Sequence, residues 1–294
     1  MKETIRLAFI GSGTMAEAMI KIAIEAQVTV PGCIVASGPR EERGQKLRAR
    51  YGVLAHTDNR QALAIDEDDA DVAVLSVKPQ VLPAVLDELQ GAIPARALVL
   101  SIVAGVSTKT IAHGLAHHAV ARVMPNTPAQ IGQGMSVWTA MSSVSDLQRG
   151  WARAILQAMG EEIYVKDEVQ LDMATAVSGT GPTFVFLMME AMTDAGVHLG
   201  FSRRVARQLV IQTVLGSALF ARQSERHLAE LRNMVTSPGG TSADAIYQLD
   251  KGGMRTVLSK AVWAAYQKSA RLGAAANGVA AMPMSLPNDE PGKE

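Results

Sequence analysis

The first half of the chain alternates between short apolar runs and segments in which apolar residues recur at helical spacing. Five segments are nearly continuous apolar runs, as expected of strands buried on both faces: 7–10, 34–36, 71–77, 97–103 and 119–124. Helices are expected in four segments between these strands: one that includes the apolar positions from Ala16 to Ala23, and those over 41–50, 59–64 and 81–89. Strands that alternate with helices predict a parallel, doubly wound sheet of the α/β class.

The pattern changes in the second half of the chain. A helix at about 146–159 and a strand at 162–165 complete the alternation, and only long helical segments follow from residue 167. We therefore predict three parts, divided near Lys166: a sheet domain over 1–165, an all-α domain over 166–273, and a tail over 274–294 whose composition predicts disorder.

The predicted helix over 183–199 is apolar nearly all round, so most of its sides must be buried. A small helical domain cannot enclose such a helix alone, which predicts a subunit interface. Two glycine-rich breaks, 178–182 and 236–242, are each expected to open a helix. Pro182 suits a first helical position, and Thr241 or Ser242 suits a cap. Each break is either a plain helix connection or a carboxylate site.

Charge and composition exclude several classes of partner. The 294 residues carry 28 basic and 28 acidic side chains without a long basic run, so we predict no nucleic-acid or membrane partner. The single cysteine, Cys33, is expected in a buried strand. The first apolar run ends at Gly11, too early for a signal peptide, and Glu190 interrupts the run over 184–192. We expect a soluble cytoplasmic protein without a metal site.

The run over 7–10 leads into Gly11-Ser-Gly13-Thr-Met-Ala16, a Gly-x-Gly-x-x-Ala pattern between a strand and a helix. Gly11 suits a tight turn, Gly13 permits close approach of a pyrophosphate, and Ala16 permits close helix packing. The N–H groups of the first helical turn then bind the phosphates. This pattern predicts a Rossmann-like domain that binds a dinucleotide.

The residues after the second strand bear on which dinucleotide binds. Ser37-Gly38-Pro39-Arg40 contains no acid for the ribose hydroxyls of NAD, whereas a hydroxyl and a guanidinium suit the 2′-phosphate of NADPH. Alternatively, Arg40 is solvated in a surface turn or occupied by Glu41 or Glu42, and NADH remains possible. The loops at 78–79, 104–105 and 125–128 should lie along the same sheet edge.

Five motifs together resemble the pyrroline-5-carboxylate reductase family over about residues 5–272: Gly11–Ala16, Val77–Gln80, Met124–Pro128, Val177–Pro182 and Val235–Thr241. The resemblance implies reduction of the cyclic imine pyrroline-5-carboxylate to L-proline with NAD(P)H, the last step of proline biosynthesis. It also implies an interlocked helical homodimer, often assembled into larger rings.

The resemblance also implies roles for individual residues. The implied cofactor-lining residues, with Arg40 added by the argument above, are Gly11, Ser12, Gly13, Thr14, Met15, Ser37, Asn59, Val77, Lys78, Pro79 and Ala104. The implied substrate-side residues are Glu168, Gly240, Thr241 and Ser242. Ser242 stands where the family usually has threonine, so the hydroxyl is retained.

Hydride transfer to a protonated imine requires placement, exclusion of water and tolerance of a positive nitrogen. Glu168 could offset that charge and Ser242 could hydrogen-bond the nitrogen, which makes them the candidate catalytic residues. His198 and His227 are alternative acids outside any motif.

Two rival functions remain at this point. A related imine reductase or β-hydroxyacid dehydrogenase shares the nucleotide domain, but such enzymes usually carry a catalytic lysine on the interdomain helix, and 183–199 contains none. A non-catalytic NADP-binding sensor is the second rival.

Overall fold

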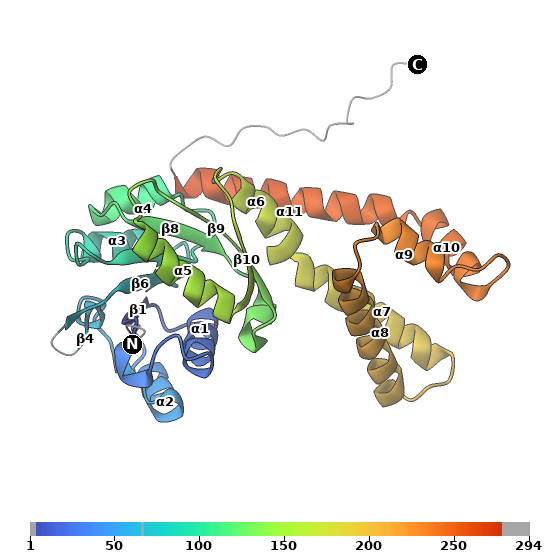
Figure 1. Cartoon of the computed structure of the whole chain (residues 1–294), viewed down its shortest axis with the longest axis horizontal. Coiled ribbons are helices and arrows are strands. Elements are labelled where there is room, and N and C mark those ends of the chain that lie inside the picture. The colour runs from blue at the N-terminus through green and yellow to red at the C-terminus, as the bar shows by residue number, and fades with distance from the viewer. Residues whose placement is uncertain (1–3, 66–67, 278–294) are drawn as a thin grey trace, which may run out of the picture. The chain divides into compact units, whose positions relative to one another are not determined.

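The computed structural model describes residues 4–65 and 68–277. The chain forms two compact units: one contains the residues up to Thr180 together with those from Ala264 onward, and the other is Gly181–Trp263 (Figure 1). The first unit extends past the predicted division near Lys166, because α6 (Gln170–Ala174) packs on strands of the sheet.

The first unit is built on an eight-stranded sheet. Its strands are β1 (Leu7–Ile10), β2 (Ile34–Ser37), β3 (Leu54–His56), β6 (Val72–Leu75), β7 (Leu98–Ser101), β8 (Val120–Met124), β9 (Gly134–Ala140) and β10 (Gly160–Tyr164). Their order is β10-β9-β8-β7-β6-β1-β2-β3. The strands from β8 to β3 are parallel, so the predicted doubly wound sheet is confirmed, and the strand order reverses between β6 and β1.

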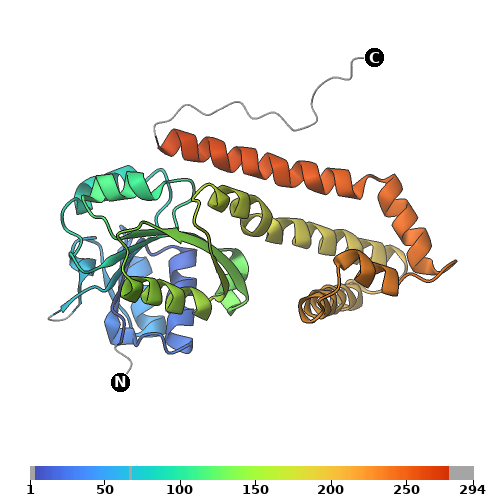
Figure 2. The same cartoon turned by 45° about the horizontal axis from the view of Figure 1, so that its top comes forward.

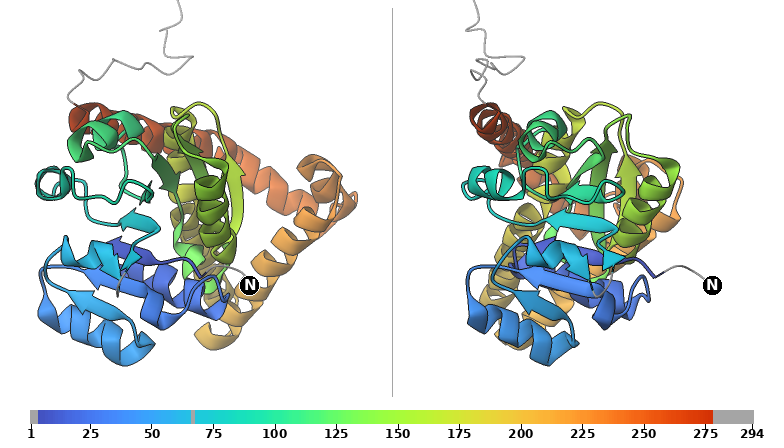
Figure 3. Two further views of the ribbon diagram at one scale, coloured as in Figure 1. Left: turned by 60° about the vertical axis from the view of Figure 1, so that its left-hand side comes forward. Right: turned by 90° about the vertical axis from the view of Figure 1, so that its left-hand side faces the viewer.

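Helices cover both faces of this sheet (Figure 3). They are α1 (Thr14–Glu25), α2 (Glu41–Tyr51), α3 (Leu82–Leu89), α4 (Thr108–Leu115) and α5 (Asp146–Ala158). Successive residues of β1 point to opposite faces: Phe9 packs in one apolar cluster with residues of α1 and α5, and Ile10 packs in the other with residues of α3 and α4. The continuous apolar runs in the sequence follow from this two-sided burial.

Four local predictions differ from the structure. β9 was not expected and runs antiparallel to β8. Cys33 is half-buried at the end of a 3₁₀ turn (Pro31–Cys33), one residue before β2, so its assignment to a buried strand is wrong. The helix expected over 59–64 is a 3₁₀ turn (Gln61–Leu63), followed by the antiparallel pair of β4 (Ala64–Ile65) and β5 (Asp68–Asp69). The break at 178–182 lies within a nearly continuous helical run, as the π-helical segment Thr175–Gly179 joins α6 to α7, with Pro182 in the second position of α7.

The second unit is helical, as predicted. It contains α7 (Gly181–His198), α8 (Arg203–Gln223), α9 (Leu228–Met234), α10 (Thr241–Lys251) and the first part of α11 (Met254–Ala276), shown in Figure 2. Phe186 and Leu187 of α7 are more than half exposed in the single chain. Among the described residues, no helix combines the length and apolar character needed to cross a bilayer.

The end of α11 corrects the predicted tail. Residues 274–276 are helical rather than disordered, and Asn277 follows them. The rest of that prediction, 278–294, lies outside the described residues.

Candidate cofactor and active site

The glycine-rich turn connects β1 to α1 as the sequence predicts. Gly11 has a φ of 104°, and a Cβ there would lie 2.9 Å from the carbonyl carbon and oxygen of Ser76. Gly13 is the N-cap of α1 and offers no side chain to its first turn. The first-turn N–H groups therefore point out of the helix without a side-chain cap, which is the arrangement that binds a phosphate.

The other predicted cofactor loops lie at the same edge of the sheet. Val77, Lys78 and Pro79 follow β6, and Ala104 follows β7, both of which are parallel to β1. The hydroxyl of Ser76 lies 2.7 Å from the carbonyl oxygen of Gly11 and so joins the β6 loop to the glycine-rich turn. The predicted grouping of these loops is confirmed.

Ser37 and Asn59 are brought together by the fold. Ser37, the last residue of β2, is fully buried, and its hydroxyl lies 2.7 Å from Oδ1 of Asn59. The Asn59 side-chain amide donates in turn to a carboxylate oxygen of Glu88 at 2.7 Å. The two residues therefore form one polar group beside the glycine-rich turn.

Two arginines flank the start of α2, and their surroundings differ. Arg40 is exposed, and within the described residues its side chain has no hydrogen-bond or ion-pair partner. Glu41 pairs with Arg48 rather than with Arg40. Arg40 is thus free to meet an anionic ligand.

Arg43 is a residue that the sequence analysis missed. Its Nε donates to the carbonyl oxygen of Ser12 at 2.8 Å, and its guanidinium pairs with Glu17 of α1 at 2.5 Å. Burial raises the pKa of Glu17, but hydrogen bonds from Arg43 and Tyr51 outweigh burial and lower it overall. The ion pair holds the glycine-rich turn against α2. The only signal for this role in the sequence was an arginine in the first turn of the helix that follows the second strand.

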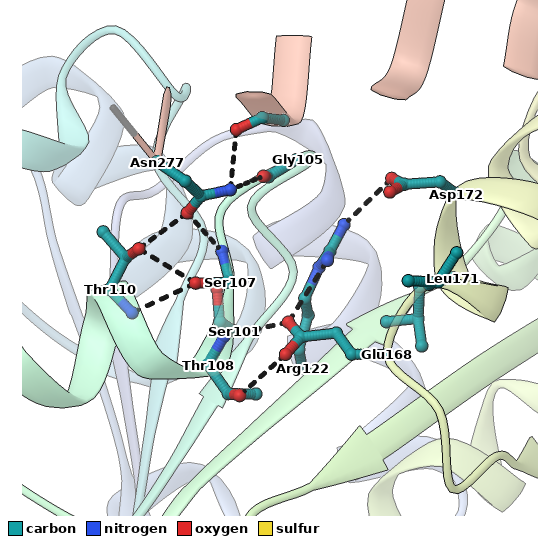
Figure 4. Close-up of polar contacts among 12 residues, drawn as sticks. Ser101, Gly105, Ser107, Thr108, Thr110, Arg122, Glu168, Leu171, Asp172 and Asn277 are labelled. Atoms are coloured by element: carbon teal, nitrogen blue, oxygen red, sulfur yellow. Dashed lines mark hydrogen bonds and ion pairs between the residues drawn. The ribbon is translucent and has the colours of Figure 1, made fainter. Parts of the chain in front are cut away.

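Glu168 lies in a polar network at the start of α4, drawn in Figure 4. One carboxylate oxygen accepts from the backbone N–H of Thr108 at 2.8 Å and from Arg122 at 3.2 Å. The other accepts from the Thr108 hydroxyl at 2.8 Å. Arg122, whose side chain is only 5% exposed, also pairs with Asp172 at 3.4 Å. Both oxygens of Glu168 are therefore engaged by the chain itself.

The predicted substrate-side residues of the last glycine-rich break belong to the second unit. Gly240 is the N-cap of α10, and Thr241 and Ser242 are its first two residues. The expectation that Thr241 or Ser242 caps the helix is wrong, because the cap position has no side-chain hydrogen bond. The Ser242 hydroxyl is consequently not used as a cap.

The two alternative acids have other surroundings. His198 is exposed at the end of α7. His227 is the N-cap of α9, and its Nδ1 accepts from the backbone N–H of Ala229 at 3.1 Å. A helix-capping role accounts for His227.

Two family models match this chain. The model described as "Pyrroline-5-carboxylate reductase dimerisation" matches residues 168–272. The model described as "NADP oxidoreductase coenzyme F420-dependent" matches residues 6–105. The two matches fall on the helical segment and on the nucleotide-binding half of the sheet.

Relatives with known names match over nearly their whole length. The chain is 42% identical over 270 residues to pyrroline-5-carboxylate reductase of Synechocystis, covering 92% of this chain and 99% of the relative. It is 43% identical to the Pseudomonas aeruginosa protein of the same name, covering 92% and 97%. A Plasmodium falciparum pyrroline carboxylate reductase structure with NADP bound has a TM-score of 0.83 at 28% identity, covering 92% and 99%.

Proposed function

Because the chain belongs to the pyrroline-5-carboxylate reductase family, we propose that it reduces the cyclic imine 1-pyrroline-5-carboxylate to L-proline, with NADPH as its preferred hydride donor. The observation that carries this proposal is the uncapped glycine-rich turn between β1 and α1, in a chain that also has the family's dimerisation segment.

The residues present fit a dinucleotide. The tight approach of Gly11 to Ser76 leaves room for backbone rather than side chain, and the N-terminus of α1 supplies N–H donors to a pyrophosphate. Arg40, exposed and unpaired among the described residues, would bind the 2′-phosphate, and the buried Ser37–Asn59 pair would shape the loop beside it. NADPH is favoured over NADH for that reason.

The bound cofactor supplies the hydride, and the chain places the substrate. The N–H groups of Thr241 and Ser242, at the start of α10, would bind the substrate carboxylate, and the Ser242 hydroxyl would hydrogen-bond the ring nitrogen. Glu168 has both carboxylate oxygens in contact with Thr108 and Arg122, so we assign it to positioning α4 rather than to moving a proton.

Assembly and location are part of the proposal. The dimerisation segment and the exposed apolar side chains of α7 support a homodimer, which can be the building block of a larger ring. The protein is proposed to act in the cytoplasm on a small-molecule substrate.

A panel of cyclic imines of different ring size tests the proposed reaction. Purified protein should oxidise NADPH fastest with the five-membered imine that carries a carboxylate, and the product should be L-proline. Faster turnover of a larger ring or of an imine without a carboxylate would favour a general imine reductase. NADPH binding without turnover of any imine would favour a sensor.

A further inference from the structure

Asn277, the last described residue, is bound to the loop that follows β7. Its side-chain oxygen accepts from the backbone N–H of Ser107 at 3.0 Å and from the Thr110 hydroxyl at 2.6 Å. Its side-chain nitrogen donates to the carbonyl oxygens of Gly105 at 3.0 Å and Gly273 at 2.6 Å. An asparagine amide has two donors and one oxygen with two lone pairs, so its whole capacity is used here (Figure 4).

The backbone of α11 also touches this loop directly. Gly105 has a φ of 78°, and a Cβ on it would lie 3.1 Å from the Cα and backbone nitrogen of Gly273. A Cβ on Gly273 would lie 3.1 Å from the carbonyl oxygen of Gly105. Two glycines therefore let the end of α11 approach the loop closely enough for Asn277 to reach it.

The first turn of α4 is held from a second direction. Ser107 is its N-cap and accepts from the N–H of Thr110 at 3.1 Å. The next residue, Thr108, is held by Glu168, and Arg122 links Glu168 to Asp172, which accepts from Ser269 of α11 at 2.9 Å. The β7–α4 loop is thus contacted both by the residues at the end of α11 and by Glu168.

This loop carries Ala104 and lies beyond β7, on the opposite side of the strand-order reversal from β2. A dinucleotide binds across such a reversal, with one nucleotide on each side. Because the residues suited to the 2′-phosphate follow β2, the β7 loop belongs to the nicotinamide half. We propose that Asn277 is a positioning residue that fixes the Ala104–Gly105 loop for the nicotinamide half of the cofactor, an inference that rests on the proposed function.

The test compares Asn277→Ala with Arg271→Ala. Arg271 is exposed on α11, six residues before Asn277, and its side chain donates a hydrogen bond to the carbonyl oxygen of Gln267 within the same helix. Affinity is measured for NADPH and for adenosine 2′,5′-bisphosphate, which lacks the nicotinamide. Asn277→Ala should weaken NADPH binding about tenfold and lower kcat, leaving the affinity for the fragment unchanged. Arg271→Ala should match the wild-type protein in both affinities.

A conservative variant and a smaller change extend the test. Asn277→Asp keeps the acceptor but places a carboxylate beside the carbonyl oxygens of Gly105 and Gly273, so it should not restore NADPH affinity. Thr110→Val removes one contact to Asn277, together with the contact between the hydroxyls of Thr110 and Ser107, and should weaken NADPH binding severalfold, which keeps the inference testable if Asn277→Ala does not fold.

Several outcomes would overturn the inference. The first is a folded Asn277→Ala protein with wild-type NADPH affinity and kcat. The second is an equal loss of affinity for NADPH and for the fragment, and the third is wild-type NADPH affinity in Asn277→Asp. When Asn277→Ala does not fold, an unchanged NADPH affinity in Thr110→Val overturns it. A wild-type protein that binds neither NADPH nor the fragment would instead contradict the proposed function.

Discussion

The two compact units differ in how they bury their apolar residues. The first has two extensive apolar clusters, one on each face of the sheet, and includes fully buried side chains such as Phe9 and Trp138. In the second unit, all of whose residues are described, the buried apolar side chains are Ala206, Val210 and Leu231. Burial of apolar surface is the main stabilising term in folding. In a single chain, the second unit therefore gains much less of this stabilisation than the first.

This difference explains why the sequence of α7 is apolar nearly all round. An all-apolar helix needs neighbours on most sides, yet α7 leaves Phe186 and Leu187 more than half exposed. An exposed apolar surface of this kind marks a site of association. The match of residues 168–272 to a dimerisation family agrees with the proposal that this surface associates with another copy of the chain.

The largest effect is expected from a charge on α7. Leu187→Asp would put a carboxylate into the surface proposed to bind a second copy, and burying an unpaired charge is costly. We expect monomeric or insoluble protein in sedimentation. Leu147→Asp is the matched control, because Leu147 is 60% exposed and Leu187 is 64% exposed, but Leu147 belongs to the first unit. A stable dimer of Leu187→Asp would contradict the contrast between the units.

The next effect concerns the cofactor in the first unit. Arg40→Ala should remove about 1.5–3 kcal/mol of NADPH binding, roughly tenfold to a hundredfold in affinity, and little of NADH binding. Arg43→Ala should weaken both cofactors alike, because Arg43 holds the glycine-rich turn through Ser12 and Glu17. Titration with both cofactors separates the two roles, and equal losses for Arg40→Ala would argue against a 2′-phosphate contact.

Ser242→Ala tests whether the second unit serves the substrate while the first serves the cofactor. Loss of a hydrogen bond to the imine nitrogen should cost about 1–3 kcal/mol of transition-state stabilisation, roughly fivefold to over a hundredfold in kcat/KM. NADPH affinity should hardly change. Ser242→Thr, which keeps the hydroxyl, should stay within a few-fold of wild type. Unchanged kcat/KM in Ser242→Ala would remove Ser242 from the mechanism.

The smallest effect is a pH dependence of the first unit's stability. His117 is buried, which lowers its pKa below the usual 6.5, and the contact of Nε2 with the carbonyl oxygen of Ala97 offsets this only in part. Below pH 6.5 the unfolded chain binds the proton more readily, so stability is full above 6.5 and falls as the pH decreases. The slope should not exceed about 1.4 kcal/mol per pH unit. Thermal unfolding of His117→Gln should lack this slope, and an identical slope in the variant would contradict it.

Much of the first unit can be predicted from sequence because its signals are local. The run over 7–10, followed by Gly11 and Gly13, encodes a buried strand, a turn and a helix within ten residues. The parallel topology follows from the alternation of strands and helices, and the shared loop edge follows from the topology. The contact between Ser37 and Asn59 joins two residues that the family motifs had indicated separately.

The rest depends on contacts between distant segments. The direction of β9 is set by its pairing with β8 and leaves no mark in its own composition. Arg43 donates to the carbonyl oxygen of Ser12, and Asn277 donates to that of Gly105. Every residue has a backbone carbonyl, so the sequence does not indicate which one a side chain will contact. The cap of α10 was misjudged because a glycine, rather than the adjacent hydroxyl residues, occupies the cap position.

The return of the chain to the first unit has a consequence for synthesis. The helical unit lies between Thr180 and Ala264 in the sequence. All strands of the sheet are therefore synthesised before this unit, and the segment from Ala264 onward is synthesised after it. The bonds of Asn277 to Gly105, Ser107 and Thr110 span more than 160 positions and can form only after residue 277 leaves the ribosome. The loop proposed to hold the nicotinamide therefore gains these bonds only at the end of translation, and a chain that stops just before residue 277 would contain every strand of the sheet but none of the bonds from Asn277.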